Sequence, residues 1–161
     1  MVRLAYERDL PSIFQIYEDA RQYMKLNGNP YQWGNSDPSE KVIQKDLKEE
    51  RLYVLERDGR LEGVFALLKD GDPCYDHIEG KGWISDGPYV AVHRVAAAKG
   101  CCGIMRQVMD YVKAIGENIR MDTHRDNLTM QHILAREGFS CRGVIRVTDG
   151  TERIAFELIL K

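Results

Sequence analysis

Hydrophobic residues recur every three or four positions in four stretches of the chain, which is the spacing of an amphipathic helix. The first stretch follows Asp9, a residue type that caps helices, has Pro11 in its first turn, and ends by Asn27-Gly28. The other helices are predicted over Ser39–Glu50, over Ile104–Ile115, and after Asn127. The chain is therefore expected to hold about four helices.

Hydrophobic and polar residues alternate in several other stretches, which predicts β-strands. The predicted strands cover Val2–Tyr6, Leu52–Glu56, Leu61–Leu68, Tyr89–Ala96, Asn118–His124, Ser140–Val147 and Ile154–Leu160. Asp58-Gly59 predicts a hairpin turn, and the glycine-containing segment Lys69–Pro88 predicts a loop with at most one short strand. One strand–helix crossover among hairpins predicts a mixed α/β fold, with a mostly antiparallel, twisted central sheet covered by helices on both faces.

The composition is that of an ordinary globular domain. The 161 residues are 43% hydrophobic and 30% charged, which predicts one domain over residues 1–161 with a single core. A net charge of −2 gives no general attraction for nucleic acid or for an anionic membrane. Four cysteines without metal-ligand spacing predict reduced thiols and no metal. No leader or membrane-spanning stretch is apparent, so a cytoplasmic location is expected.

A loop of small residues, Ala97–Gly103, joins a predicted strand to a predicted helix. Such a loop aims backbone N–H groups and the helix N-terminus at a diphosphate, although similar turns occur in any α/β protein. The loop is not a P-loop, because no Gly-Lys-Ser/Thr ends it, and Gly100 and Gly103 do not form the dinucleotide pattern. A phosphate site and a simple chain reversal both stay open.

The same segment resembles motif A of the GNAT N-acetyltransferase superfamily. Gly103 follows Val95 by eight positions, as the first glycine of that family's pyrophosphate loop follows its strand valine. Gly100 stands where the family has Arg or Gln, and Met105 where it has Gly or Ala. The C-terminal third resembles one bacterial subgroup of small GNAT proteins. That likeness is carried by Ile119–Met130, Glu137-Gly-Phe139, Cys141–Ile145 and Asp149–Phe156, with Gln32-Trp33, Trp83 and His93-Arg94 also in place.

The resemblance implies a fold in which the parallel fourth and fifth strands, here Tyr89–Ala96 and Asn118–His124, splay apart around acetyl-CoA. It implies an acyltransferase that moves acetyl to a primary amine of a small molecule, amino acid or peptide, by direct attack in a ternary complex. A CoA-binding sensor or regulatory module without turnover is the alternative. A homodimer is a possible assembly, and neither nucleic acid nor membrane is an expected partner.

The resemblance also implies which residues hold the cofactor. His93, Arg94 and Val95 should run beside the acetyl and pantetheine portion, and Asn127 should either contact the cofactor or simply cap its helix. The N–H groups of the loop should bind the pyrophosphate; they belong to Gly100, Cys101, Cys102, Gly103, Ile104 and Met105.

The expected catalytic acid is missing. The family's tyrosine falls at Leu134, which cannot donate a proton. His93 and His124 are the candidates for proton transfer, because imidazole titrates near pH 6.5. Strict strand alternation would place His93 on the same face as Val95. Either histidine could instead be structural: His93 as a packed strand residue, His124 as a partner of the following turn.

An aromatic acceptor pocket is the last expectation. Several aromatic residues fall in segments near the mouth of the splayed strands, and they could line a pocket for a small amine or belong to the core. The predicted pocket residues are Tyr31, Trp33, Tyr75, Trp83 and Tyr89.

Overall fold

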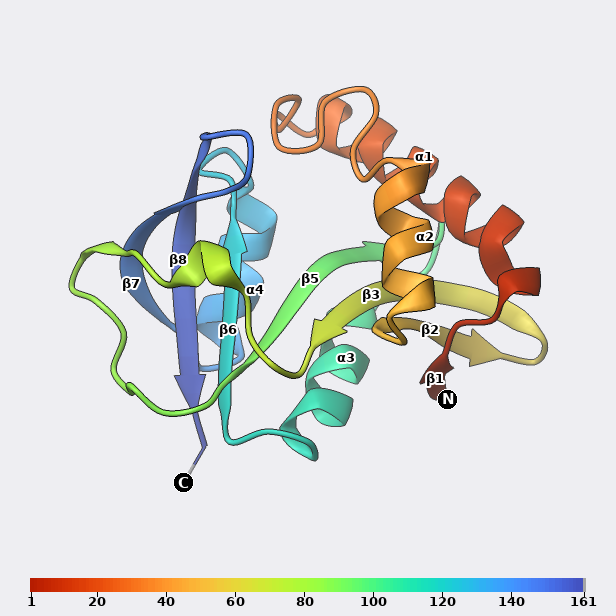
Figure 1. The fold of residues 1–161 in the computed structure, drawn as a ribbon. Coiled ribbons are helices and arrows are strands. Elements are labelled where there is room, and N and C mark those ends of the chain that lie inside the picture. The colour runs from red at the N-terminus through yellow and green to blue at the C-terminus, as the bar shows by residue number, and fades with distance from the viewer. Residues whose placement is uncertain (161) are drawn as a thin grey trace.

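The computed structural model describes residues 1–160, so the last residue of the predicted domain lies outside the described residues. Its eight strands form one sheet, in the order β1-β2-β3-β5-β6-β8-β7-β4 (Figure 1). The strands are β1 (Val2–Leu4), β2 (Leu52–Arg57), β3 (Arg60–Leu68), β4 (Glu79–Gly80), β5 (Val90–Ala97), β6 (Asn118–Thr123), β7 (Ser140–Arg146) and β8 (Glu152–Ile159). Neighbours pair antiparallel except β5 and β6, which confirms the predicted mostly antiparallel α/β sheet.

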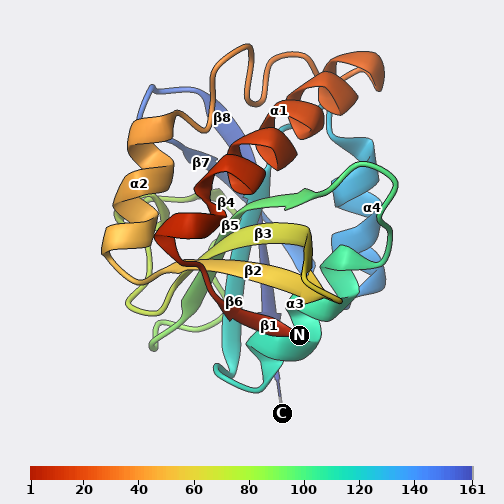
Figure 2. The ribbon, with the colours of Figure 1, turned by 90° about the vertical axis from the view of Figure 1, so that its right-hand side faces the viewer.

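Four α-helices cover the two faces of the sheet, as the turn of the molecule between Figures 1 and 2 shows. They are α1 (Leu10–Leu26), α2 (Glu40–Lys48), α3 (Ile104–Lys113) and α4 (Leu128–Arg136). α1 and α2 pack through Ile13, Tyr17 and Ile43 on one face, and α3 and α4 pack through Val108 and Leu134 on the other. None of the helices within residues 1–160 is long and apolar enough to cross a membrane.

The segment between β3 and β5 is mostly irregular, as predicted. It contains a 3₁₀ turn at Pro73–Tyr75 and the two-residue strand β4, which adds to the edge of β7. Gly143 in β7 makes this addition sterically possible, because a Cβ there would lie 1.9 Å from the carbonyl oxygen of Glu79. The short strand thereby attaches the loop to the β7 side of the sheet.

The parallel pair β5–β6 is joined over a short stretch only. Val90 pairs with Ile119 and Ala91 with Arg120, and no pairing follows toward the C-terminal ends of the two strands. Figure 1 shows β5 bending away from β6 toward α1 beyond this point. The splay expected from the family resemblance is therefore present, and its opening begins next to Val92.

A bulge in β5 corrects the predicted alternation of faces. Arg94 has φ of +53°, and the register against β3 shifts beside it. Val92 and Val95 consequently both pack against the core under α3, although strict alternation would place them on opposite faces. His93 points to the other face, toward Tyr75. The prediction that His93 and Val95 share a face is wrong, because an inserted residue reverses strand parity.

Candidate active site

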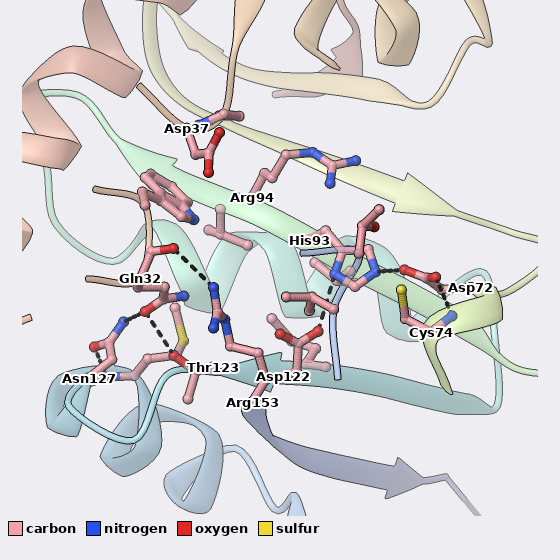
Figure 3. A pocket seen from close by; sticks show the side chains of 18 of the residues that line it. Gln32, Asp37, Asp72, Cys74, His93, Arg94, Asp122, Thr123, Asn127 and Arg153 are labelled. Atoms are coloured by element: carbon pink, nitrogen blue, oxygen red, sulfur yellow. Dashed lines mark hydrogen bonds and ion pairs between the residues drawn. The ribbon is translucent and has the colours of Figure 1, made fainter. Parts of the chain in front are cut away.

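A cleft of about 460 Å³ lies where β5 and β6 separate. β5 and β6 carry His93 and Asp122 along it (Figure 3), and residues of the α1–α2 loop and of the β7–β8 turn complete the lining. The lining is mixed rather than apolar. Its polar and charged members include Gln32, Asp37, Asp72, His93, Arg94, Asp122, Thr123, Asn127, Thr148, Asp149 and Arg153.

His93 lies between two carboxylates on the wall of this cleft. Its Nε2 is 2.7 Å from Oδ2 of Asp72, in a close ion pair without the alignment of a hydrogen bond, and its Nδ1 is 3.5 Å from Oδ2 of Asp122. The Tyr75 hydroxyl donates to the same Asp122 oxygen at 2.6 Å. The three side chains therefore hold the imidazole at a fixed position in the cleft wall.

The electrostatics of this group follow from burial and charge. Burial raises the pKa of the Asp72 carboxyl. His93 and the Cys74 amide lower it by a larger amount, so the resulting pKa is about 2. Burial, and next the charge of Asp122, raise the pKa of Tyr75 well above its ordinary value. At neutral pH the group thus contains an ionised Asp72 and a neutral Tyr75.

His124 occupies a different setting. Its Nδ1 accepts the backbone N–H of Asp126 at 3.0 Å, the structural bond that sequence reasoning kept as one option, and it does not belong to the cleft lining. Burial, followed by the nearby charge of Arg153, lowers its pKa. His124 therefore orders the turn into α4. Leu134, at the position of the family's tyrosine, is fully buried in the core.

The strained backbone of Arg94 is fixed from both ends. Its guanidinium donates twice to Asp46, from Nε at 2.8 Å and from Nη2 at 3.0 Å, and its carbonyl accepts the Tyr17 hydroxyl at 2.8 Å. Asp46 has no exposed surface, and the guanidinium contacts both of its oxygens, which is the two-point geometry of a strong arginine–carboxylate pair. These contacts from α1 and α2 keep a left-handed residue in mid-strand, at a cost of about 1–2 kcal/mol. Arg94 thus shapes the bulge beside Val95.

The loop before α3 offers backbone rather than side chains. Gly100 and Gly103 have φ of +81° and +71°, and no side chain caps the first turn of α3. Built Cβ atoms at both glycines would meet nothing within 4 Å. The side chains of Ile104 and Met105 are buried in the core, so only their N–H groups face the loop. Cys101 and Cys102 are free thiols.

Asn127 is the N-cap of α4, since its Oδ1 accepts the N–H of Met130 at 3.0 Å. Its amide nitrogen donates to Oε1 of Gln32 at 3.0 Å, and it also lines the cleft. The capping role is therefore present, and a contact with the cofactor stays a prediction. Gln32 fastens the α1–α2 loop across the cleft (Figure 3).

Of the five aromatic residues predicted for the acceptor pocket, Trp33 lines this cleft and the other four do not; Tyr31 is 78% exposed. Tyr75 is buried behind His93, and Trp83 and Tyr89 enclose the guanidinium of Arg120 at 4.1 and 4.0 Å. These aromatics build the wall under the cleft. Sequence reasoning missed Asp72 and Arg153, which lie in loop-flanking positions without a motif.

No group of three or more His, Cys, Asp or Glu side chains within residues 1–160 is arranged to hold a metal ion. His93 and its two carboxylates lie together in the cleft wall. They adjoin a cleft that is open enough for a second reactant.

Comparison with solved structures finds the same fold in acetyltransferases of the GNAT family. An acetyltransferase of the GNAT family from Streptococcus agalactiae is 28% identical, with a TM-score of 0.89 over 100% of this chain and 95% of that one. A Staphylococcus aureus protein provisionally assigned as an acetyltransferase is 27% identical, with a TM-score of 0.71 over 100% and 99%. A Salmonella typhimurium protein of 14% identity, solved with its cofactor acetyl-CoA, gives 0.62 over 100% and 94%.

No protein-family model and no curated protein matches the sequence. The structural likeness nevertheless spans the entire chain. The chain has the fold of GNAT-family acetyltransferases.

Proposed function

We propose that the protein is an acetyl-CoA-dependent N-acetyltransferase that acts on a primary amine of a small molecule, amino acid or peptide. The observation that carries this proposal is the splay of β5 from β6, with His93 on the wall of the resulting cleft. Acetyl-CoA enters between the two strands, and the amine enters from the side of the α1–α2 loop. The amine nitrogen then attacks the thioester directly.

The loop before α3 fits the pyrophosphate of CoA. Its two left-handed glycines leave open space, and the uncapped N-terminus of α3 carries partial positive charge and free N–H donors. The predicted binding residues are Gly100, Cys101, Cys102, Gly103, Ile104 and Met105, through their backbone. The N–H of Cys101 already donates to the carbonyl of Ala98 at 2.9 Å, so the donors come from the other five. His93, Arg94 and Val95 pass beside the acetyl-bearing arm, and Asn127 contacts it from α4 while it caps the helix.

Proton transfer is assigned to His93. An amine must lose a proton to attack, and His93 accepts it while Asp72 and Asp122 stabilise the imidazolium that forms. The new bond joins the amine nitrogen to the acetyl carbon, and the carbon–sulfur bond breaks. The thiolate leaves and takes a proton from solvent or from His93, since a thiol has a pKa of only about 8.5. A proton donor at position 134 is therefore not needed for this reaction.

A CoA-binding module without turnover is the second candidate. It is favoured by one specific observation: Leu134, in place of the family's tyrosine, is sealed in the core and cannot reach a ligand. A screen for thiol release from acetyl-CoA separates the two candidates, using amines, amino acids and peptide N-termini as acceptors. Release that depends on an acceptor supports the enzyme. Saturable acetyl-CoA binding without release from any acceptor supports the module.

Asp72→Asn should shift the pH dependence of turnover. The Asp72 carboxylate, whose pKa is about 2, is ionised across the neutral range, and its Oδ2 lies 2.7 Å from Nε2 of His93. Its negative charge favours positive charge on the neighbouring proton acceptor, and asparagine removes that interaction. We expect the acid limb of the kcat profile to move to lower pH by at least half a unit, which is about 0.7 kcal/mol of lost interaction.

The control for this shift is Glu79→Gln, which removes a carboxylate from an exposed histidine, His77, outside the cleft. Its profile should match that of the wild type. A profile of Asp72→Asn that is unmoved, or moved to higher pH, would show that the Asp72 charge does not act on the titrating group.

A further inference from the structure

Arg153, at the start of β8, is a buried cation without a carboxylate partner. Only 8% of its surface is exposed, and it belongs to the lining of the cleft. Within residues 1–160 no Asp or Glu oxygen lies within 4.0 Å of its nitrogens. A buried ion without a counter-ion costs several kcal/mol.

The contrast with Arg120 shows that this is a specific feature of the cleft. Arg120 is the other buried arginine among the described residues, with 4% of its surface exposed. It pairs with Glu157 at 3.0 Å and lies between the rings of Trp83 and Tyr89. The structural arginine thus has both a counter-ion and aromatic neighbours. Arg153 has no direct ion pair and no ring stacked on it among the described residues, although the fold buries it almost as completely. The nearest carboxylate contact is indirect: Thr151 accepts from Arg153 and donates to Asp149.

The hydrogen bonds of Arg153 leave part of the guanidinium open. Nη1 donates to Oγ1 of Thr151 and to the carbonyl of Glu152, both at 3.0 Å, and Nη2 donates to the carbonyl of Gln32 at 3.0 Å. These are three of the five N–H donors of an arginine, and all three acceptors are neutral. An N–H of Nε and one of Nη2 are left, on the edge that carboxylates bind in pairs. The three bonds fix the group in place, and Figure 3 shows the one to Gln32.

The cleft carries charge on two sides. The carboxylates of Asp72 and Asp122 flank His93 on the β5 and β6 side, and Arg153 stands on the β8 side. Asp149 of the β7–β8 turn also lines the cleft, and its carboxylate accepts from Thr151 rather than from Arg153. A molecule with an ammonium group near His93 and an anionic group near Arg153 would match both ends. Acetyl-CoA does not supply that anion if its phosphates occupy the loop before α3, since the adenine end of the cofactor is then held there.

We propose that Arg153 binds a carboxylate on the amine acceptor, so that the acceptors are amino acids or similar amino-carboxylates. The inference rests on the proposed N-acetyltransferase activity and narrows its substrate class. Arg153 supplies a preformed, desolvated cation, which makes the carboxylate the main determinant of acceptor choice. Bidentate pairing of this kind is both strong and geometrically selective.

The test compares acceptors that differ only in this group. Alanine, β-alanine and γ-aminobutyrate are each paired with their amides, and kcat/KM is measured by thiol release with wild-type protein, Arg153→Gln and Arg153→Lys. For at least one pair the wild type should prefer the carboxylate. Arg153→Gln should reduce that preference by about 30-fold or more, because truncating a buried charge pair has effects of this size. Arg153→Lys should retain part of the preference.

Two results would overturn the inference. If Arg153→Gln lowers kcat/KM equally for the carboxylate and the amide, so that the preference is kept, Arg153 only holds Gln32 in place. The inference is also wrong if Arg153→Gln weakens the calorimetric Kd for acetyl-CoA, because the anion then belongs to the cofactor.

The activity itself can fail separately. If no acceptor causes release of CoA thiol from acetyl-CoA, the proposed enzyme activity is excluded. Calorimetric binding of the same carboxylate and amide pairs to CoA-loaded protein then still tests Arg153. Binding of a carboxylate that is lost in Arg153→Gln upholds the anion site in that case. Equal binding of both members overturns it.

Discussion

Gly103→Asp is expected to weaken acetyl-CoA binding by about 100-fold, equivalent to nearly 3 kcal/mol. Gly103 ends the loop before α3, and a side chain there enters open space rather than the core. The carboxylate would occupy the positive end of α3, where we place the pyrophosphate, and would repel it. Aspartate tolerates the φ of +71° better than most residues, so the fold should survive.

Gly103→Asn is the matched control, because asparagine has the same shape and the same tolerance of left-handed backbone but no charge. Calorimetric titration of both variants with acetyl-CoA gives the comparison, and thermal unfolding checks that both fold. Asparagine should weaken binding at most about tenfold. Equal and small losses in the two variants would place the pyrophosphate elsewhere.

His93→Gln is expected to lower kcat at least tenfold, and up to the 10²–10⁴-fold that general acid–base groups contribute. Glutamine has hydrogen-bonding atoms but cannot carry a proton between reactants at neutral pH. The Kd for acetyl-CoA should change little, because we expect the strand to contact the cofactor through its backbone. Steady-state kinetics across pH, together with calorimetry, separates the two quantities.

His124→Gln is the control, since His124 bonds to the turn before α4 and lies outside the cleft lining. It should retain kcat and the pH profile. If His124→Gln loses both while His93→Gln keeps them, the two roles are reversed. If neither variant changes kcat or the pH profile, solvent or a residue of the 69–88 loop takes the proton.

The hydrophobic pattern predicted the fold well because each element repeats one simple spacing. Helix α3 begins at Ile104 as expected, and the hairpin turns at Asp58-Gly59. Strand parity failed at β5, where the bulge at Arg94 depends on contacts from α1 and α2. Those contacts join residues 48 and 77 positions apart, and local alternation carries no information about them.

Part of the candidate site could also be predicted from the sequence. His93, Val95 and Asn127 do line the cleft, since a family motif marks their positions. Asp72 and Arg153 come from a loop and a strand end, and only the folded sheet brings them to the cleft. The aromatics were misplaced because aromatic side chains suit a core wall as well as a pocket, and composition does not distinguish the two.

The most direct test of the account is to follow the acetyl group itself. Wild-type protein is mixed with isotopically labelled acetyl-CoA and an amino-carboxylate acceptor, and the products are analysed by mass spectrometry. The account predicts one labelled acetyl on the amine nitrogen for each free thiol, with no labelled protein at any time. Label that stays on CoA, or that first becomes attached to the protein, would contradict direct transfer in the cleft between β5 and β6.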